Sequence, residues 1–178
     1  VEGIDDIALT TNGYLLAAQA GPLRDAGLDR VTVSLDSLDD NVFRQMNGRN
    51  FGTEPVLQGI MAAEHAGFKQ IKINCVVQRG VNDQTMVDLA RHFKGTDHIV
   101  RFIEYMDVGT LNGWNLEQVV TAREILETIS IAMPLEPVSA NYPGEVAKRY
   151  AYADGGGEIG IIASVSQPFC GDCTRARV

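Results

Sequence analysis

The sharpest chemical signal in this sequence is a pair of cysteines near its end, Cys170 and Cys173, with two residues between them. Two thiolates at this spacing can hold one corner of a zinc or iron–sulfur site, but such sites normally need three or four ligands. The remaining cysteine, Cys75, lies in an apolar run and is expected to be a small buried hydrophobe. A thioredoxin-type redox pair is the alternative. The spacing indicates half of a metal site, with a further ligand beyond Val178.

A basic segment follows the cysteines directly. If residues 174–178 are extended, Arg175 and Arg177 share one face, with Ala176 on the other. Two guanidinium groups side by side suit a phosphate-bearing ligand through bidentate hydrogen bonds. The alternative is an exposed polar strand edge.

Polar residues also interrupt the apolar runs that we expect to be strands: Thr10, Ser34, Lys72, Asn74 and Glu104. A fully packed parallel sheet tends toward continuous Val, Ile and Leu, so these residues suggest one face that lines a ligand-holding lumen. Lys72 and Asn74 share a face by parity.

Parity also groups residues of the strand expected at 98–105. Phe102, Glu104 and Met106 fall on one face, and Arg101 falls on the opposite one. Thr10 lies at the C-terminal end of the first expected strand, which is where barrel enzymes assemble their sites.

The elements that must position these residues alternate between strand and helix. Strands are expected at 4–11, 30–35, 70–77 and 98–105. Helices are expected at 14–26 (with Pro22 starting a second piece), from 36 through 46, at 54–65, at 83–93 and from a capping box at Thr121 and Glu124. This alternation predicts an α/β fold with a parallel sheet, either an arc of a (β/α) barrel, which we favour, or an open doubly wound sheet.

The chain turns β-like beyond Pro134. Residues 147–153 and 159–165 are expected to form a hairpin around a glycine-rich turn. Residues 155–160 formally match the dinucleotide motif Gly-x-Gly-x-x-Gly, but that motif must leave a strand and open a helix. We therefore reject the dinucleotide-binding interpretation.

Composition narrows the class of protein. The 178 residues are 45% hydrophobic and 21% charged, with a net charge of -8, which argues against binding a nucleic-acid polymer. No apolar run reaches membrane-spanning length, and three cysteines do not make a secreted disulfide framework. We expect no membrane partner and a cytoplasmic location. Because the sequence starts at Val1 and stops just after the cysteine pair, we expect a segment truncated at both ends.

Five motifs, in this order, resemble one known family. They are Leu9-Thr-Thr-Asn-Gly13, Val33-Ser-Leu-Asp-Ser37, Lys72-Ile-Asn74, Arg101-Phe-Ile-Glu-Tyr-Met106 and Phe169-Cys-Gly-Asp-Cys-Thr-Arg-Ala-Arg177. The series closely resembles the GTP 3′,8-cyclases, which belong to the radical S-adenosylmethionine (radical SAM) superfamily. The cysteine–arginine ending is specific, whereas Thr-Thr-Asn-Gly is shared by many radical SAM enzymes.

The resemblance implies an activity and a fold. It implies a lyase with two 4Fe-4S clusters that uses S-adenosylmethionine to convert GTP to 3′,8-cyclo-7,8-dihydro-GTP, the first step of molybdenum cofactor (molybdopterin) biosynthesis. It implies a partial radical SAM (β/α) barrel over residues 1–133, with a C-terminal β-hairpin extension. Residues 134–178 would start the C-terminal cluster-binding region.

The resemblance also implies roles for individual residues, although no catalytic residue is assigned in this segment. GTP contacts are implied for Thr10, Lys72, Arg175, Ala176 and Arg177. S-adenosylmethionine contacts are implied for Ser34 and Met106, and metal ligation for Cys170 and Cys173. A homodimer and a downstream cyclic pyranopterin monophosphate synthase are the implied protein partners.

Three family features are missing from the sequence. There is no Cys-x3-Cys-x2-Cys motif for the first cluster, no third cysteine after Cys173, and no Gly-Gly tail. We therefore expect the 178-residue piece alone to be inactive. Two alternatives stay open at this point: another radical SAM oxidoreductase with an auxiliary iron–sulfur cluster, or a non-catalytic zinc-binding module.

Overall fold

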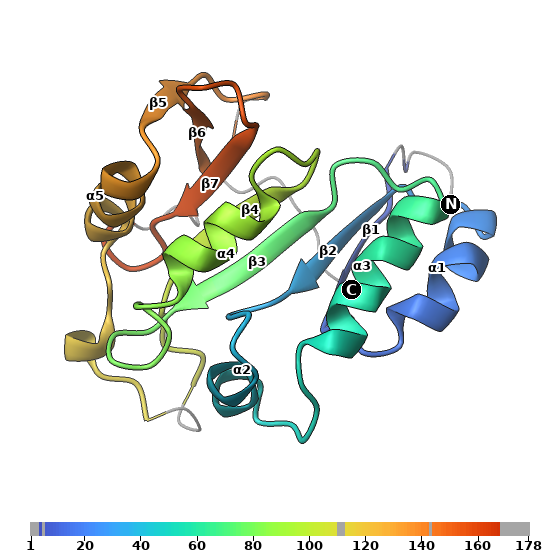
Figure 1. Cartoon of the computed structure of the whole chain (residues 1–178), viewed down its shortest axis with the longest axis horizontal. Helices are drawn as coiled ribbons and strands as arrows, with labels where there is room; N and C mark the ends of the chain where they lie inside the picture. The colour runs from blue at the N-terminus through green and yellow to red at the C-terminus, as the bar shows by residue number, and fades with distance from the viewer. Residues whose placement is uncertain (1–3, 5, 110–112, 143, 168–178) are drawn as a thin grey trace.

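The fold is built on one seven-stranded sheet, in the order β1-β2-β3-β4-β7-β6-β5 (Figure 1). The computed structural model describes residues 4, 6–109, 113–142 and 144–167. The strands are β1 Ala8–Thr11, β2 Arg30–Ser34, β3 Lys72–Val77, β4 Ile99–Glu104, β5 Leu135–Val138, β6 Lys148–Tyr152 and β7 Glu158–Ile162. The helices are α1 Leu16–Asp25, α2 Asp40–Asn47, α3 Glu54–His65, α4 Met86–Phe93, the 3-10 helix η1 Leu116–Gln118 and α5 Ala122–Ala132.

Strand direction confirms the expected α/β fold and a partial barrel. Strands β1 to β4 are parallel to one another, and β7 adds to β4 in the same direction. Strands β6 and β5 then continue the sheet antiparallel. Short connections that carry a helix between parallel strands produce this arrangement through right-handed crossovers. The β6–β7 hairpin therefore extends the parallel sheet.

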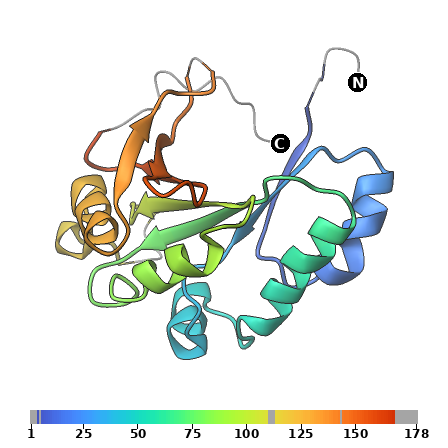
Figure 2. The ribbon, with the colours of Figure 1, turned by 45° about the horizontal axis from the view of Figure 1, so that its top comes forward.

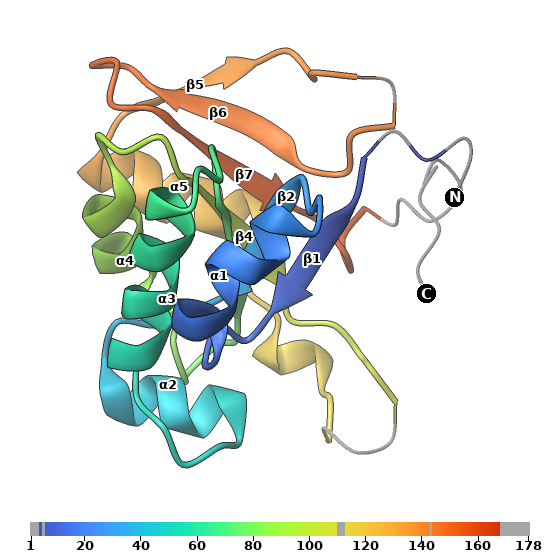
Figure 3. The ribbon, with the colours of Figure 1, turned by 90° about the vertical axis from the view of Figure 1, so that its right-hand side faces the viewer.

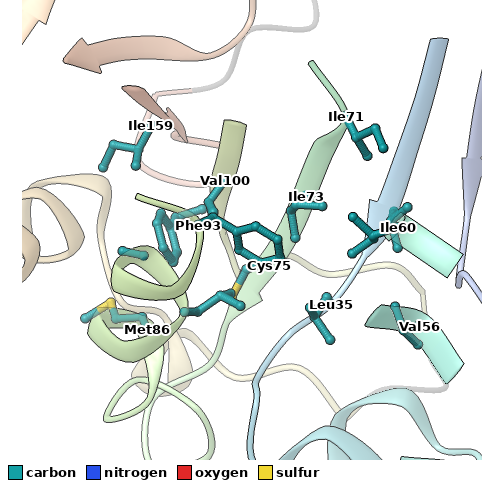
Figure 4. Packing of buried hydrophobic residues seen from close by; sticks show 14 of the residues in the cluster. Leu35, Val56, Ile60, Ile71, Ile73, Cys75, Met86, Phe93, Val100 and Ile159 are labelled. Carbon is teal, nitrogen blue, oxygen red and sulfur yellow. The ribbon is translucent and has the colours of Figure 1, made fainter. Parts of the chain in front are cut away.

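Helices α1 to α5 lie together on one side of the sheet, as the two rotated views show (Figures 2 and 3). Apolar side chains from the strands meet them there, including Val33, Ile73 and Phe102, none of which is exposed. Figure 4 shows this packing between the strands and helices α3 and α4. Burying each such side chain contributes about 1.5–3 kcal/mol. The opposite side of the sheet, here called the open face, carries the polar residues.

The expected local signals are confirmed around the later elements. Thr121 caps α5 by accepting the Glu124 N–H, and the Glu124 carboxylate accepts the Thr121 N–H at 2.8 Å. The glycine-rich residues 155–157 join the antiparallel strands β6 and β7, so the expected hairpin is confirmed and the glycines open no helix. No helix among the described residues is long and apolar enough to cross a membrane.

The structure differs from the sequence analysis at two places. Helix α1 runs through Pro22 as one helix, because its buried residues Leu16 and Ala20 pack on α3 together with Leu23. Strand β5 is an addition to the strands that the sequence predicted, and Pro137 lies inside it. Proline is tolerated at the edge of a sheet, and β5 is the last strand in the order.

Candidate functional site

The open face brings together candidate residues from neighbouring strands. Thr10 pairs in register with Thr32, and Thr32 pairs with Lys72, so these residues form one row across β1, β2 and β3. Residues paired in a parallel ladder project to the same side. Neighbouring strands lie roughly 4.8 Å apart, which places Thr10 and Lys72 about 10 Å from each other. The two residues expected to contact GTP in the described chain therefore share one row, here called the Lys72 row.

A second row lies two residues further along each strand. Ser34 pairs with Asn74, Asn74 pairs with Arg101, and Arg101 pairs with Gly160. This set is here called the Asn74 row. It contains Ser34, the residue expected to contact S-adenosylmethionine, and lies nearer the C-terminal ends of the parallel strands. The residues of the two rows are thus two positions apart along each strand, roughly 6.6 Å.

Arg101 is held in place on this face. Its Nε donates to Asn74 Oδ1 at 2.9 Å, which ties the guanidinium to the neighbouring strand. Gly160 makes room for it, because an added Cβ would lie 3.1 Å from Arg101 Cγ and 3.2 Å from Ala147 Cβ. A guanidinium carries a permanent positive charge and five N–H donors in a planar fork. Arg101 is thus a candidate anion-binding residue.

Further charges lie at the other end of the open face. Arg30 pairs with the carboxylate of Asp6, and both side chains are partly exposed. The hydrogen bond that Asp6 accepts from Arg30 lowers the pKa of Asp6, and the positive charge of Lys72 lowers that pKa further. Lys72 therefore lies within electrostatic range of the Asp6 carboxylate.

The placement of Glu104 corrects the sequence analysis. Glu104 pairs with Val77 on the helix-covered side, where it is completely buried. It therefore does not line the lumen with Lys72 and Asn74. Parity correctly separated it from Arg101, but parity does not say which side the helices cover.

The turn that ends β1 is shaped by close packing. Gly13 has φ +76, and an added Cβ would lie 2.9 Å from Val56 Cγ1. Its N–H donates to Thr11 Oγ1 at 3.1 Å, and the N–H of Tyr14 donates to Asn12 Oδ1 at 3.2 Å. The Thr-Thr-Asn-Gly sequence thus forms a compact turn that leaves Thr10 exposed on its strand.

Asp36 is a carboxyl group that the sequence analysis did not single out. It follows β2, and its Oδ1 accepts the Val76 N–H at 2.8 Å, continuing the link between β2 and β3. Burial raises the pKa of Asp36 to about 6, although that hydrogen bond opposes the shift. A carboxyl group with this pKa can exchange a proton near neutral pH. The sequence does contain a signal for Asp36, because this residue stands two positions after Ser34, just beyond the end of an expected strand.

Only one of the remaining expected site residues belongs to the described part of the chain. Met106 follows β4 and is half-buried. Cys170, Cys173, Arg175, Ala176 and Arg177 lie outside the described residues. Among the residues described, no three His, Cys, Asp or Glu side chains gather to hold a metal ion.

Cys75 behaves as expected. It is fully buried, and burial raises the pKa of its thiol well above the ordinary value. The nearby negative charge of Asp36 raises that pKa further. Such a thiol stays protonated and is unsuited to metal ligation.

Two family models match the chain. The radical SAM superfamily model matches residues 1–93, and the Molybdenum Cofactor Synthesis C model matches residues 98–178. Among solved structures, the chain is similar to a radical SAM methyltransferase from Sphaerobacter thermophilus, with a TM-score of 0.54 over 70% of this chain and 36% of that one. At 17% identity this likeness concerns the fold alone.

Curated relatives match at much higher identity. The chain is 59% identical over its full length to a protein named GTP 3′,8-cyclase from Xanthomonas campestris pv. campestris (strain 8004), and 54% identical over 98% of its length to one from Acidothermus cellulolyticus. It covers 52% and 48% of these proteins, so the chain spans about half the length of the curated relatives it matches. Because the radical SAM model covers more than half of the chain and the partial barrel agrees with it, the chain belongs to the radical SAM superfamily.

Proposed function

We propose that the protein containing this chain is a GTP 3′,8-cyclase, which converts GTP to 3′,8-cyclo-7,8-dihydro-GTP in the first step of molybdenum cofactor biosynthesis. The observation that carries the proposal is the open face, where Lys72 and Arg101 lie in adjacent rows beside polar residues of two other strands, β1 and β2. The 59% identity to a relative of that name supports the same reaction.

GTP would lie along the Lys72 row. The ammonium group of Lys72 supplies a positive charge for phosphate oxygens, and the Thr10 hydroxyl supplies a hydrogen-bond donor and acceptor. In the sequence, Arg175, Ala176 and Arg177 would complete the site at the phosphate end, where arginine binds two oxygens at once. The positive charges of this local site would attract a nucleotide despite the net charge of -8 on the chain.

S-adenosylmethionine would lie beside GTP, at the C-terminal ends of the strands. Ser34 offers a hydroxyl in the Asn74 row, and Met106 follows the end of β4. This placement would hold the two molecules side by side, so that a reactive carbon on one faces the other. Fixing two reactants in this way removes much of the entropic barrier to their reaction.

We propose two 4Fe-4S clusters as cofactors of the whole protein. Cysteine thiolates are the ordinary ligands of such clusters, so Cys170 and Cys173 have donor chemistry that fits two positions of one cluster. When bound, the clusters supply the electron for reductive cleavage of S-adenosylmethionine and an iron for the purine. The chain itself would position GTP and keep water from the reacting atoms.

The proposal extends to organisation and partners. Residues 134–178 would begin the C-terminal cluster-binding region, joined to the barrel portion 1–133 through the β4–β7 pairing. We propose a homodimer, and a cyclic pyranopterin monophosphate synthase as the enzyme that takes the product. Use of GTP and S-adenosylmethionine as substrates would place the protein in the cytoplasm.

Binding measurements on the intact protein test the assignment of Lys72. We expect Lys72→Ala to weaken GTP binding roughly tenfold or more, since a hydrogen bond to a charged group contributes about 1.5–3 kcal/mol. S-adenosylmethionine binding should change less than twofold. Lys69→Ala is the matched control, because Lys69 is exposed just before β3. Equal losses for both ligands, or no loss of GTP binding, would favour another radical SAM enzyme acting on a substrate without phosphate.

The isolated 178-residue chain should make no product. Its sequence has no Cys-x3-Cys-x2-Cys motif to hold the cluster that cleaves S-adenosylmethionine. Incubating the reconstituted chain with GTP, S-adenosylmethionine and dithionite should give neither 5′-deoxyadenosine nor cyclised nucleotide by mass spectrometry. Turnover by this chain would contradict the division of roles proposed here.

A further inference from the structure

His98 is a buried histidine at the junction between α4 and β4. It directly precedes β4, is only 6% exposed, and its backbone N–H donates to Thr96 Oγ1 at 3.1 Å. The ring of Phe93, the last residue of α4, has its centroid 6.0 Å from that of the imidazole. The imidazole therefore lies among the packed side chains of the helix-covered side, away from the open face.

The two ring nitrogens of His98 have different surroundings. Nε2 lies 3.1 Å from Oε1 of Glu64, near the C-terminal end of α3. Nδ1 is buried and has no hydrogen-bond partner in the described part of the chain. Because the ring nitrogen beside a carboxylate carries the proton of a neutral imidazole, Nε2–H donates to Glu64 and Nδ1 keeps its lone pair. This bond joins the end of α3 to the start of β4.

Protonation of His98 would create a second N–H group at Nδ1, where none of the described residues offers an acceptor. A buried charged group with an unsatisfied donor is strongly unfavourable. The charges that act on His98 are those of Glu64 in α3 and Asp97 in its own segment, and both favour the protonated ring, whereas α4 presents the uncharged Phe93. Burial outweighs the two carboxylates, so the pKa of His98 is lowered.

We propose that the contact between His98 and Glu64 is an acid-sensitive latch that holds the end of α3 against the start of β4. The latch is closed while the imidazole is neutral and opens when the ring gains a proton, because water can then satisfy the new N–H group. The pKa of an unfolded histidine is about 6.5, and that of His98 in the folded protein is lower. The contribution of the latch to stability is therefore complete above about pH 6.5 and is lost as the pH falls.

The competing interpretation is an ordinary salt bridge. In that case an imidazolium would pair with Glu64, and the contact would strengthen as the pH falls. The two interpretations predict opposite effects of Glu64→Gln, since glutamine keeps an oxygen acceptor for Nε2–H but removes the negative charge that favours protonation. A latch becomes more sensitive to acid in this variant, whereas a salt bridge loses its gain at low pH.

Thermal unfolding of the intact protein at pH 7.5 and pH 5.5 measures this sensitivity. His98→Gln supplies an amide N–H in place of Nε2–H and does not titrate in this range. The melting temperature of wild type should fall by roughly 2–4 °C more than that of His98→Gln. The fall for Glu64→Gln should exceed that of wild type. His65→Gln, at the exposed end of the same helix α3, is the control and should keep the wild-type fall.

Hydrogen exchange shows where the protein opens. The Phe68 N–H donates to the Ala63 carbonyl at the end of α3, and the Ile99 N–H donates to the Ile71 carbonyl at the start of β4, each at 3.1 Å. At pH 5.5 both amides should exchange severalfold faster in wild type than in His98→Gln. At pH 7.5 the two proteins should exchange alike at these positions.

An NMR titration of the His98 ring in wild type requires no variant and guards against a general loss of folding. Its midpoint should lie below about pH 6.5, the ordinary value for histidine. A midpoint above that value, or a Glu64→Gln protein less sensitive to acid than wild type, would establish the salt bridge and overturn the latch. Equal pH dependence of wild type and His98→Gln would overturn it as well.

Discussion

Replacing Gly59 tests how tightly helix α3 presses on the turn that ends β1. An added Cβ at Gly59 would lie 2.8 Å from the Gly13 carbonyl oxygen and 2.9 Å from Leu16 Cβ. Both atoms belong to the close packing of α3 against α1 and the Thr-Thr-Asn-Gly turn. The carbonyl is backbone, so relief requires the helix or the turn to move.

Two opposing contributions determine the size of the effect. Alanine is about 1 kcal/mol better than glycine inside a helix. Forcing a methyl group into a packed contact costs roughly 1–3 kcal/mol. The expected net change for Gly59→Ala therefore lies between about zero and a 2 kcal/mol loss of stability. Gly59→Val should be worse, since its branched side chain adds volume and disfavours the helix.

Thermal unfolding of the intact protein, followed by circular dichroism, measures these changes. Each kcal/mol corresponds to roughly 2–4 °C for a domain of this size. Gln58→Ala is the control, because Gln58 is exposed on the same helix and should change stability by less than about 0.5 kcal/mol. A Gly59→Ala protein stabilised by the full helix-propensity value would refute the argument, since the contact would then impose no cost.

Three further outcomes follow from the described contacts. Asn74→Ala removes the acceptor of Arg101 Nε, so GTP titration should show roughly tenfold weaker binding, and an unchanged affinity would contradict a role for that pair. Thr121→Ala should lower the free energy of unfolding by about 1 kcal/mol in urea through loss of the helix cap, whereas Thr128→Ala, exposed on the same helix, should have little effect. The pKa of Glu124 is about 2, held down by the Thr121 N–H and then by Arg79, so its contribution is present above the unfolded pKa of about 4.3 and is lost as the pH falls toward 2. Because Glu124 is partly exposed, that contribution should be small, and Glu124→Gln should reduce the acid sensitivity measured between pH 2 and 4.

The sequence predicted the parallel part of the sheet well because its signals are local. Alternating apolar strands and amphipathic helices with short connections leave few topologies. Parity correctly placed Lys72 and Asn74 on one face, since side chains alternate along any strand.

What the sequence analysis missed depends on contacts between distant residues. The side occupied by Glu104 follows from its register with Val77, which no local pattern contains. The continuity of α1 through Pro22 depends on packing against α3, and Pro137 fits a strand because β5 has an open edge. The roles of the cysteine–arginine motif remain predictions.

The joining of β7 to β4 has a consequence for the order of folding. Val100 pairs with Ile159, so the outer edge of β4 stays unpaired until β7, which is synthesised much later, is present. The β6–β7 hairpin closes through a short turn and can form early by itself, whereas the long-range pairing is entropically slow. Until the hairpin docks, β4 offers unsatisfied backbone groups to any neighbouring chain. During synthesis, the interval between the emergence of these two strands therefore leaves the nascent polypeptide with an unpaired strand edge that another chain can bind.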